Sequence, residues 1–302
     1  MEPQNYKIYV FFNTQLPISM PLSPFFSVVI PTYHRNDLLV KCLDCLAPGR
    51  QTLSADQYEV IITDDGSHAT AEKIVLKYYT WAKWVAGSSL GPACNRNNGA
   101  KYTQGEWLVF TDDDCLPDPQ WLEAYRKAIA AQTACLVFEG RVYVERPRRS
   151  FGETAPVNES GGYLWSCNFA IHRQLFEFLG GFDERFPYAA MEDVDLRLRI
   201  TKSKHKFIFV KEAAVCHPWR YKGNWKQLKK RQESVLLYLS IHPDQFTHLN
   251  YRFFIKSFIR TVMTALTSVR QLNFYEIKEV FEQSIYFLRM SIFVVIKSFL
   301  IL

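Results

Sequence analysis

Three consecutive carboxylates, Asp112, Asp113 and Asp114, follow an apolar run that ends at Phe110. Like charges this close repel one another, so a cation, hydrogen-bond donors or solvent must offset them. Carboxylate oxygens suit Mg²⁺ or Mn²⁺, which usually share such a site with substrate phosphates. On an extended backbone alternate side chains point the same way, so we expect Asp112 and Asp114 to face the ligand together, with Asp113 as the outlier. A cation at this point would neutralise a diphosphate and make it a better leaving group.

Other titratable residues could complete such a site. Glu192 and Asp193 form a second acidic group, and a carboxylate near the reaction centre could take a proton from an incoming hydroxyl. The alternative is that this pair only complements the dipole of a helix start. His217 could offer a neutral imidazole to the metal, although a lone histidine is more often structural.

The elements that must position these residues alternate along the chain. Strands are predicted over 25–33, 58–63, 106–111, 135–145 and 163–171, and helices over 35–48, 70–82, 91–105, 119–132 and 191–203. The last of these could also be a strand, but its acidic start and basic end favour a helix. Residues 146–162 are typical of a mobile loop. This order favours an α/β fold with a mainly parallel sheet, whose ligand site lies at the carboxyl ends of the strands.

That rule brings a further acidic pair to the same edge. Asp64 and Asp65 directly follow the strand predicted over 58–63 and should therefore lie near Asp112. Aspartate is also a common turn and N-cap residue, so a purely structural role remains open.

The last third of the chain differs in charge. Net charge is +6, and residues 201–302 hold 17 Lys and Arg against 6 Asp and Glu. Segments 251–271 and 284–302 are apolar with regularly placed basic residues, as in amphipathic helices. The second is near the minimum length of a membrane span, but Arg289 and Lys297 interrupt it, which favours lying in an anionic membrane interface. Packing of the two helices on the domain, or on a second copy in a homo-oligomer, is the alternative.

The overall composition excludes several classes. With 48% hydrophobic and 22% charged residues over 302 positions, the chain should be folded throughout most of its length. No zinc-finger or RNP motif supports a nucleic-acid partner. The first 24 residues lack a secretory signal and the seven cysteines are scattered, so we expect reduced thiols and a cytoplasmic location. Cys42 and Cys45 form an isolated CxxC within a predicted helix, which argues against a zinc or redox site.

Six ordered blocks between Phe26 and His242 match a known pattern. They are SVVIPTYHR, VIITDDGS, GPACNRNNGA, FTDDDCLPDP, CNFAIHRQLFEFLGGFDERF and MEDVDLRLR. With them the chain resembles the family 2 glycosyltransferases, inverting enzymes of GT-A fold that move sugars from nucleotide-diphosphate donors. The match covers most of the chain, and the order of six blocks is far more specific than a single DxD motif.

The resemblance implies a role for each matching residue. Donor binding would fall to Pro31, Tyr33, Arg35, Asp65, Arg96, Asp112 and Asp113, with Asp65 accepting the uracil N3 hydrogen. Asp112, Asp114 and His217 would hold Mn²⁺ or Mg²⁺. Asp193 corresponds to the catalytic base, with Glu192 beside it for the acceptor, and Gly180 to Asp183 match a turn on the acceptor side. Cys167 departs from the family, where glycine is frequent, which leaves the floor of the acceptor site undefined.

Together these features predict three regions and one reaction. Residues 1–24 would be an N-terminal extension, 25–245 a GT-A domain, and 246–302 a basic, apolar helical tail. We expect metal-dependent, inverting transfer of a single sugar, most simply from a UDP-sugar, to a hydroxyl of a glycan or lipid-linked saccharide at the cytoplasmic face of a membrane. The absence of a QxxRW block argues against processive synthesis. The alternative is a catalytically silent nucleotide-sugar-binding protein on the same fold.

Overall fold

The computed structural model describes residues 24–221, 224–267 and 274–301. Nearly all of the predicted N-terminal extension, and the ends of both predicted tail segments, lie outside the described residues. Within them, an eight-stranded sheet forms the centre of the chain, in the order β3-β2-β1-β4-β8-β6-β9-β5. A second sheet pairs β7 with β10.

The sheet is mainly parallel, as predicted. Its strands are β1 (Phe26–Thr32), β2 (Tyr58–Asp64), β3 (Lys83–Ala86), β4 (Trp107–Thr111), β5 (Leu116–Pro117), β6 (Val137–Tyr143), β8 (Asn168–His172) and β9 (Ile208–Cys216). Strand β1 pairs in parallel with β2 and β4, whereas β8 runs antiparallel to β4 and β6, and β5 antiparallel to β9. The minor sheet joins β7 (Glu153–Thr154) to β10 (Arg220–Tyr221).

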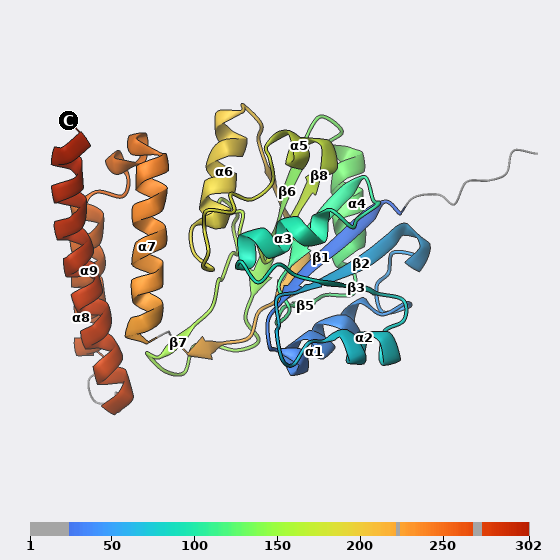
Figure 1. Ribbon diagram of the computed structural model, residues 1–302, viewed down its shortest axis with the longest axis horizontal. Helices are drawn as coiled ribbons and strands as arrows, with labels where there is room; N and C mark the ends of the chain where they lie inside the picture. Colours follow the sequence, from blue (N-terminus) through green and yellow to red (C-terminus); the bar gives the residue numbers. More distant parts are fainter. Residues whose placement is uncertain (1–23, 222–223, 268–273, 302) are drawn as a thin grey trace, which may run out of the picture.

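Helices cover both faces of the central sheet (Figure 1). One apolar cluster joins the sheet to α1 (Asn36–Leu46), α2 (Glu72–Tyr78) and α4 (Trp121–Ala131). A second cluster joins it to α3 (Pro92–Ala100), α5 (Arg173–Phe178) and α6 (Glu192–Lys202). Neighbouring residues of β1 divide between them, since Val28 belongs to the first cluster and Val29 to the second. This division follows from the alternation of side chains along a strand that is buried on both faces.

Three long helices stand beside the domain at the far left of Figure 1. They are α7 (Trp225–Ile241), α8 (Tyr251–Thr267) and α9 (Phe274–Ile301), with a short 3₁₀ turn at Pro243–Thr247. Tyr286, Met290 and Val294 of α9 are buried in the same apolar cluster as the sheet's second face. The tail therefore packs on protein along one side. Among the described residues, no helix combines the length and apolarity that a membrane span requires.

Several predicted boundaries were wrong. The helix predicted over 70–82 ends at Tyr78, because Lys83–Ala86 forms the edge strand β3. The helix from Gly91 stops at Ala100, and the strand predicted over 163–171 begins only at Asn168. Segment 191–203 is a helix, as the charge pattern indicated, and 146–162 is mostly loop apart from β7.

Candidate active site

Polar residues from four strands meet at the carboxyl edge of the sheet. Thr32 ends β1, Asp64 ends β2, the aspartate triplet follows β4, and His217 follows β9. Thr32 Oγ1 donates to Asp113 Oδ2 at 2.7 Å, and the backbone N–H of Asp65 donates to the Thr32 carbonyl at 3.0 Å. The predicted convergence of the acidic pairs is therefore confirmed.

The aspartate triplet follows the end of β4 and lies in a turn. The chain leaves β4 at Thr111 and turns, so that the N–H of Cys115 donates to the carbonyl of Asp112 at 3.1 Å. In a turn, side chains two apart need not face the same way, and Asp113 is fully buried.

Three arginines provide the positive charge that was expected beside the three aspartates. Arg96 contacts Asp112 at 2.7 Å, and Arg35 contacts Asp113 at 2.6 Å. Arg35 also reaches Asp114 at 3.3 Å, and Arg220 of β10 forms a further ion pair with it. Arg220 was missed in the sequence, although it stands three residues after the singled-out His217.

Burial sets the protonation of these groups. Desolvation raises the pKa of Asp113 to about 7, because it outweighs the attraction of Arg35. Asp112 is also desolvated, but Arg96 and Arg220 outweigh that effect and hold its pKa below the ordinary value. Arg96, itself buried, has a raised pKa because its two carboxylate neighbours overcome desolvation. The carboxyl edge of the sheet thus holds buried carboxylates whose charges are compensated by arginines.

Asp114, Cys115 and His217 form a group that could hold a metal. One ligand atom from each lies within 4.8 Å of the others, and all three residues are buried. Asp114 Oδ1 faces His217 Nε2 at 3.6 Å, and that oxygen is buried without a hydrogen-bond partner among the residues the structure describes. Burial lowers the pKa of His217, which favours the neutral ring that binds metal. The residues present therefore fit a divalent cation, while Asp112, also predicted as a ligand, lies outside this group and pairs with Arg96.

The second acidic pair lies in the first turn of α6. Met191 precedes it in a left-handed conformation (φ 74°), which turns the chain sharply into the helix. Arg96 also contacts Glu192 at 3.2 Å, so one guanidinium joins both acidic groups. Desolvation and the nearby Asp193 raise the pKa of Glu192 to about 8. Desolvation also raises the pKa of the half-buried Asp193, which moves a potential base toward neutral pH.

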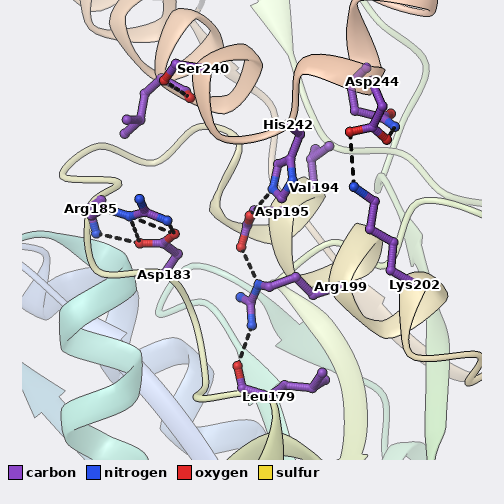
Figure 2. A network of polar contacts seen from close by, with 12 residues as sticks. Leu179, Asp183, Arg185, Val194, Asp195, Arg199, Lys202, Ser240, His242 and Asp244 are labelled. Carbon is purple, nitrogen blue, oxygen red and sulfur yellow. Dashed lines mark hydrogen bonds and ion pairs between the residues drawn. The ribbon is translucent and has the colours of Figure 1, made fainter.

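A second polar network contacts α6 through Asp195 and Arg199 (Figure 2). Buried Asp195 contacts Nε2 of His242 at 2.6 Å and Nε of Arg199 at 2.7 Å. Arg199 continues to the carbonyls of Leu179 and Gly181, at the turn that the sequence placed on the acceptor side. The network thus connects the end of α7, the helix that carries Asp193 and this turn.

The residues expected to hold the nucleotide base lie at the carboxyl ends of β1 and β2. Asp65 Oδ1 accepts from the N–H of Ser89 at 3.0 Å, and Oδ2 from the N–H of Gly91 at 3.3 Å, so its carboxylate is fixed in place. Desolvation raises the pKa of Asp65. Pro31 is buried within β1, whereas Tyr33 is 59% exposed and its ring centroid lies 4.3 Å from that of His34.

Comparison with protein families gives a direct match. The model of the family described as Glycosyl transferase family 2 matches residues 27–186. That range includes the aspartate triplet and Arg96, but it ends before Glu192, Asp193 and His217.

Curated relatives agree with this match. Validoxylamine A glucosyltransferase of Streptomyces hygroscopicus subsp. limoneus is 30% identical in an alignment 218 positions long that covers 59% of this chain and 48% of the relative. Glycosyltransferase AglE of Haloferax volcanii is 28% identical over 229 residues, 70% of this chain and 72% of the relative. The chain spans about half the length of the first relatives it matches.

Solved structures share the fold. S. aureus TarS 1-349 in complex with UDP has a TM-score of 0.53 at 20% identity, covering 88% of this chain and 80% of that one. Mannosyltransferase PcManGT from Pyrobaculum calidifontis, in complex with GDP-Man and Mn²⁺, has a TM-score of 0.59 at 18% identity, covering 91% and 88%. At such identities the likeness establishes the architecture alone.

Proposed function

The chain belongs to glycosyl transferase family 2, and on this premise we propose that it transfers a single sugar from a nucleotide-diphosphate sugar to a hydroxyl group. The donor would be a UDP-sugar and the acceptor a glycan or lipid-linked saccharide, with inversion at the anomeric carbon. One observation carries the proposal. Arg96 contacts both Asp112, which would bind the donor, and Glu192, which lies next to the candidate base. The donor and the acceptor would therefore bind on either side of this arginine.

Each residue of the site would have a separate role in the transfer. Asp193 would accept the proton of the acceptor hydroxyl as the oxygen attacks, and its raised pKa suits that task. Glu192, held by Arg96, would orient the acceptor, and Asp65 would accept the N3 hydrogen of uracil. Asp114 and His217 would hold a divalent cation such as Mn²⁺ or Mg²⁺, which supplies charge compensation for the departing diphosphate.

Two features of other proteins support the donor class. TarS has been solved with UDP and with UDP-GlcNAc, and PcManGT with GDP-Man and Mn²⁺. The fixed carboxylate of Asp65 can accept the N3 hydrogen of a uracil ring, whereas N3 of a neutral cytosine ring carries no hydrogen to donate.

The first experiment is a thermal-shift panel of UDP, GDP, dTDP and CDP with Mn²⁺ or with chelator. Selective binding to the folded state raises its melting temperature. We expect a shift with UDP and Mn²⁺ that is lost in Asp114→Asn and retained in Asp37→Asn, whose carboxylate is exposed on α1. Release of UDP from UDP-sugars then separates an enzyme from a catalytically silent binding protein. Absence of any nucleotide shift would contradict the donor site.

Helices α8 and α9 would bind an anionic membrane surface through their exposed apolar and basic side chains. Phe274, Phe281 and Leu266 are 77%, 66% and 61% exposed, and Lys256 and Arg260 are exposed on the same pair of helices. Exposed apolar side chains with basic neighbours are typical of helices that lie in a membrane interface. We expect salt-sensitive binding to vesicles that contain anionic lipid, weakened in Phe274→Ser/Phe281→Ser. Concentration-dependent dimerisation without vesicle binding would instead assign this face to a second copy of the chain.

A further inference from the structure

Cys115 lies beside the candidate metal ligands because of strand pairing. It directly precedes β5, His217 directly follows β9, and these antiparallel strands pair Leu116 with Cys216. The pairing places Cys115 next to His217 although about a hundred residues separate them in the chain. Asp114 is the neighbour of Cys115 in the turn, so all three side chains gather at one point, buried from solvent.

The orientation of Asp114 leaves one of its carboxylate oxygens available to bind a cation. Arg35 and Arg220 both contact Oδ2, whereas Oδ1 points to His217 Nε2 at 3.6 Å. His217 Nδ1 lies 2.7 Å from the carbonyl of Pro218, which can only accept, so Nδ1 carries the proton and Nε2 presents a lone pair in the neutral ring. Two acceptor atoms thus face each other at the spacing of roughly 3–4 Å that two ligands of one cation have.

We infer that Cys115 is the third ligand of this cation and gives the site a preference for thiophilic ions such as Zn²⁺ and Co²⁺ over Mg²⁺. A carboxylate, a thiolate and an imidazole form a donor set that suits these ions, whereas Mg²⁺ prefers oxygen. The bond to the cation replaces the S–H bond of Cys115, and the proton leaves to solvent. The biological use of this ion preference rests on the proposed function, because the cation would belong to the donor site. The test below does not require that function.

Nearby thiols provide matched controls. Cys167 is buried close to Cys115, and Cys42 places its Sγ 3.7 Å from the carbonyl of Asp112. Neither belongs to the group whose ligand atoms converge. A structural thiol in this core should therefore behave like Cys42 or Cys167, and a metal ligand should not.

The experiment titrates the full chain with Co²⁺ alone and follows the near-ultraviolet thiolate-to-cobalt charge-transfer band. We expect a band that saturates at one ion per chain, disappears in Cys115→Ser and in His217→Ala, and persists in Cys42→Ser and Cys167→Ser. Zn²⁺ affinity, measured by competition, should fall at least about tenfold in Cys115→Ser, while Mg²⁺ affinity changes much less.

Wild-type protein gives a second measurement if Cys115→Ser fails to fold. The ¹¹³Cd resonance of the cadmium-loaded chain should show the downfield shift of a single thiolate ligand. Absence of that shift, absence of the cobalt band, or a band that survives in Cys115→Ser would overturn the assignment. None of these results bears on nucleotide binding with Mn²⁺, so failure here is distinguishable from failure of the proposed function.

Discussion

Arg96 contacts Glu192 at 3.2 Å across 96 positions of sequence, and through its other terminal nitrogen it contacts Asp112 at 2.7 Å. Its guanidinium also lies 5.5 Å from the ring of Phe182. One buried cation therefore connects the end of β4 to the first turn of α6. This side chain therefore links the aspartate that follows β4 to the helix turn that carries the candidate base.

Replacement of Arg96 by methionine should strongly destabilise the fold. Ionised Asp112 would lose its charged partner and Glu192 a hydrogen-bond donor, and breaking a buried ion pair typically costs about 3–5 kcal/mol. Urea unfolding of Arg96→Met measures the loss. Arg141→Met is the matched control, because its pair with Glu159 is partly exposed and screened, and should change stability by less than about 1 kcal/mol. Equal losses in the two variants would argue against a central role for Arg96.

The raised pKa of Glu192 predicts a specific dependence of stability on pH. Its pKa is about 8 in the folded chain against an ordinary value of 4.5, so the folded state keeps a proton that the unfolded state releases between these limits. The contribution of Glu192 is fully present below about pH 4.5 and is lost as pH rises toward 8. Glu192→Gln cannot titrate. The free energy of unfolding of the wild type should therefore fall relative to this variant, by at most about 1.4 kcal/mol per pH unit.

Urea unfolding of both proteins from pH 5 to pH 9 measures this difference. Glu212→Gln removes an exposed carboxylate and should follow the wild type in parallel over the whole range. A constant difference between the wild type and Glu192→Gln across the range would show that Glu192 titrates normally.

The sequence predicted the sheet because its central strands are buried on both faces. Phe26–Thr32 and Trp107–Thr111 are mostly apolar and buried at every position, and this burial leaves little freedom for another structure. Once these strands are parallel, the meeting of Asp65 with the aspartate triplet follows from topology. The edge strand Lys83–Ala86 was missed because only Val85 in it is buried, so no periodic signal marks it.

Contacts between distant segments could not be predicted in the same way. The ion pair of Arg220 with Asp114 depends on where β10 returns to the rim, and the neighbourhood of Cys115 and His217 depends on the pairing of β5 with β9. Each of these relationships is set by tertiary geometry, which local patterns do not encode.

The network behind α6 should stabilise the chain measurably. Asp195 is fully buried and accepts contacts from His242 and Arg199, and hydrogen bonds to charged groups contribute about 1.5–3 kcal/mol each. Asp195→Asn should lower the urea midpoint accordingly. Asp244→Asn, which removes the charge of the exposed pair with Lys202 seen in Figure 2, should have little effect. If both variants unfold like the wild type, the network does not hold α6.

Asp193→Asn tests the proposed base, since an amide is nearly isosteric but cannot accept the proton of an acceptor hydroxyl. If Asp193 is the base, kcat for sugar transfer should fall by about 10²–10⁴, while nucleotide binding in the thermal-shift assay stays near the wild-type value. Asp195→Asn, two residues along the same helix, separates loss of the base from displacement of the helix, because it alters position and stability without removing the Asp193 carboxylate. In the wild type the rate should rise with pH as the acidic pair of α6 loses its proton, and Asp193→Asn should abolish the part of that profile that belongs to the base. Near-normal transfer by Asp193→Asn would show that another group accepts the proton. Glu192 lies in the same turn and has a pKa of about 8, so it would be the next residue to replace.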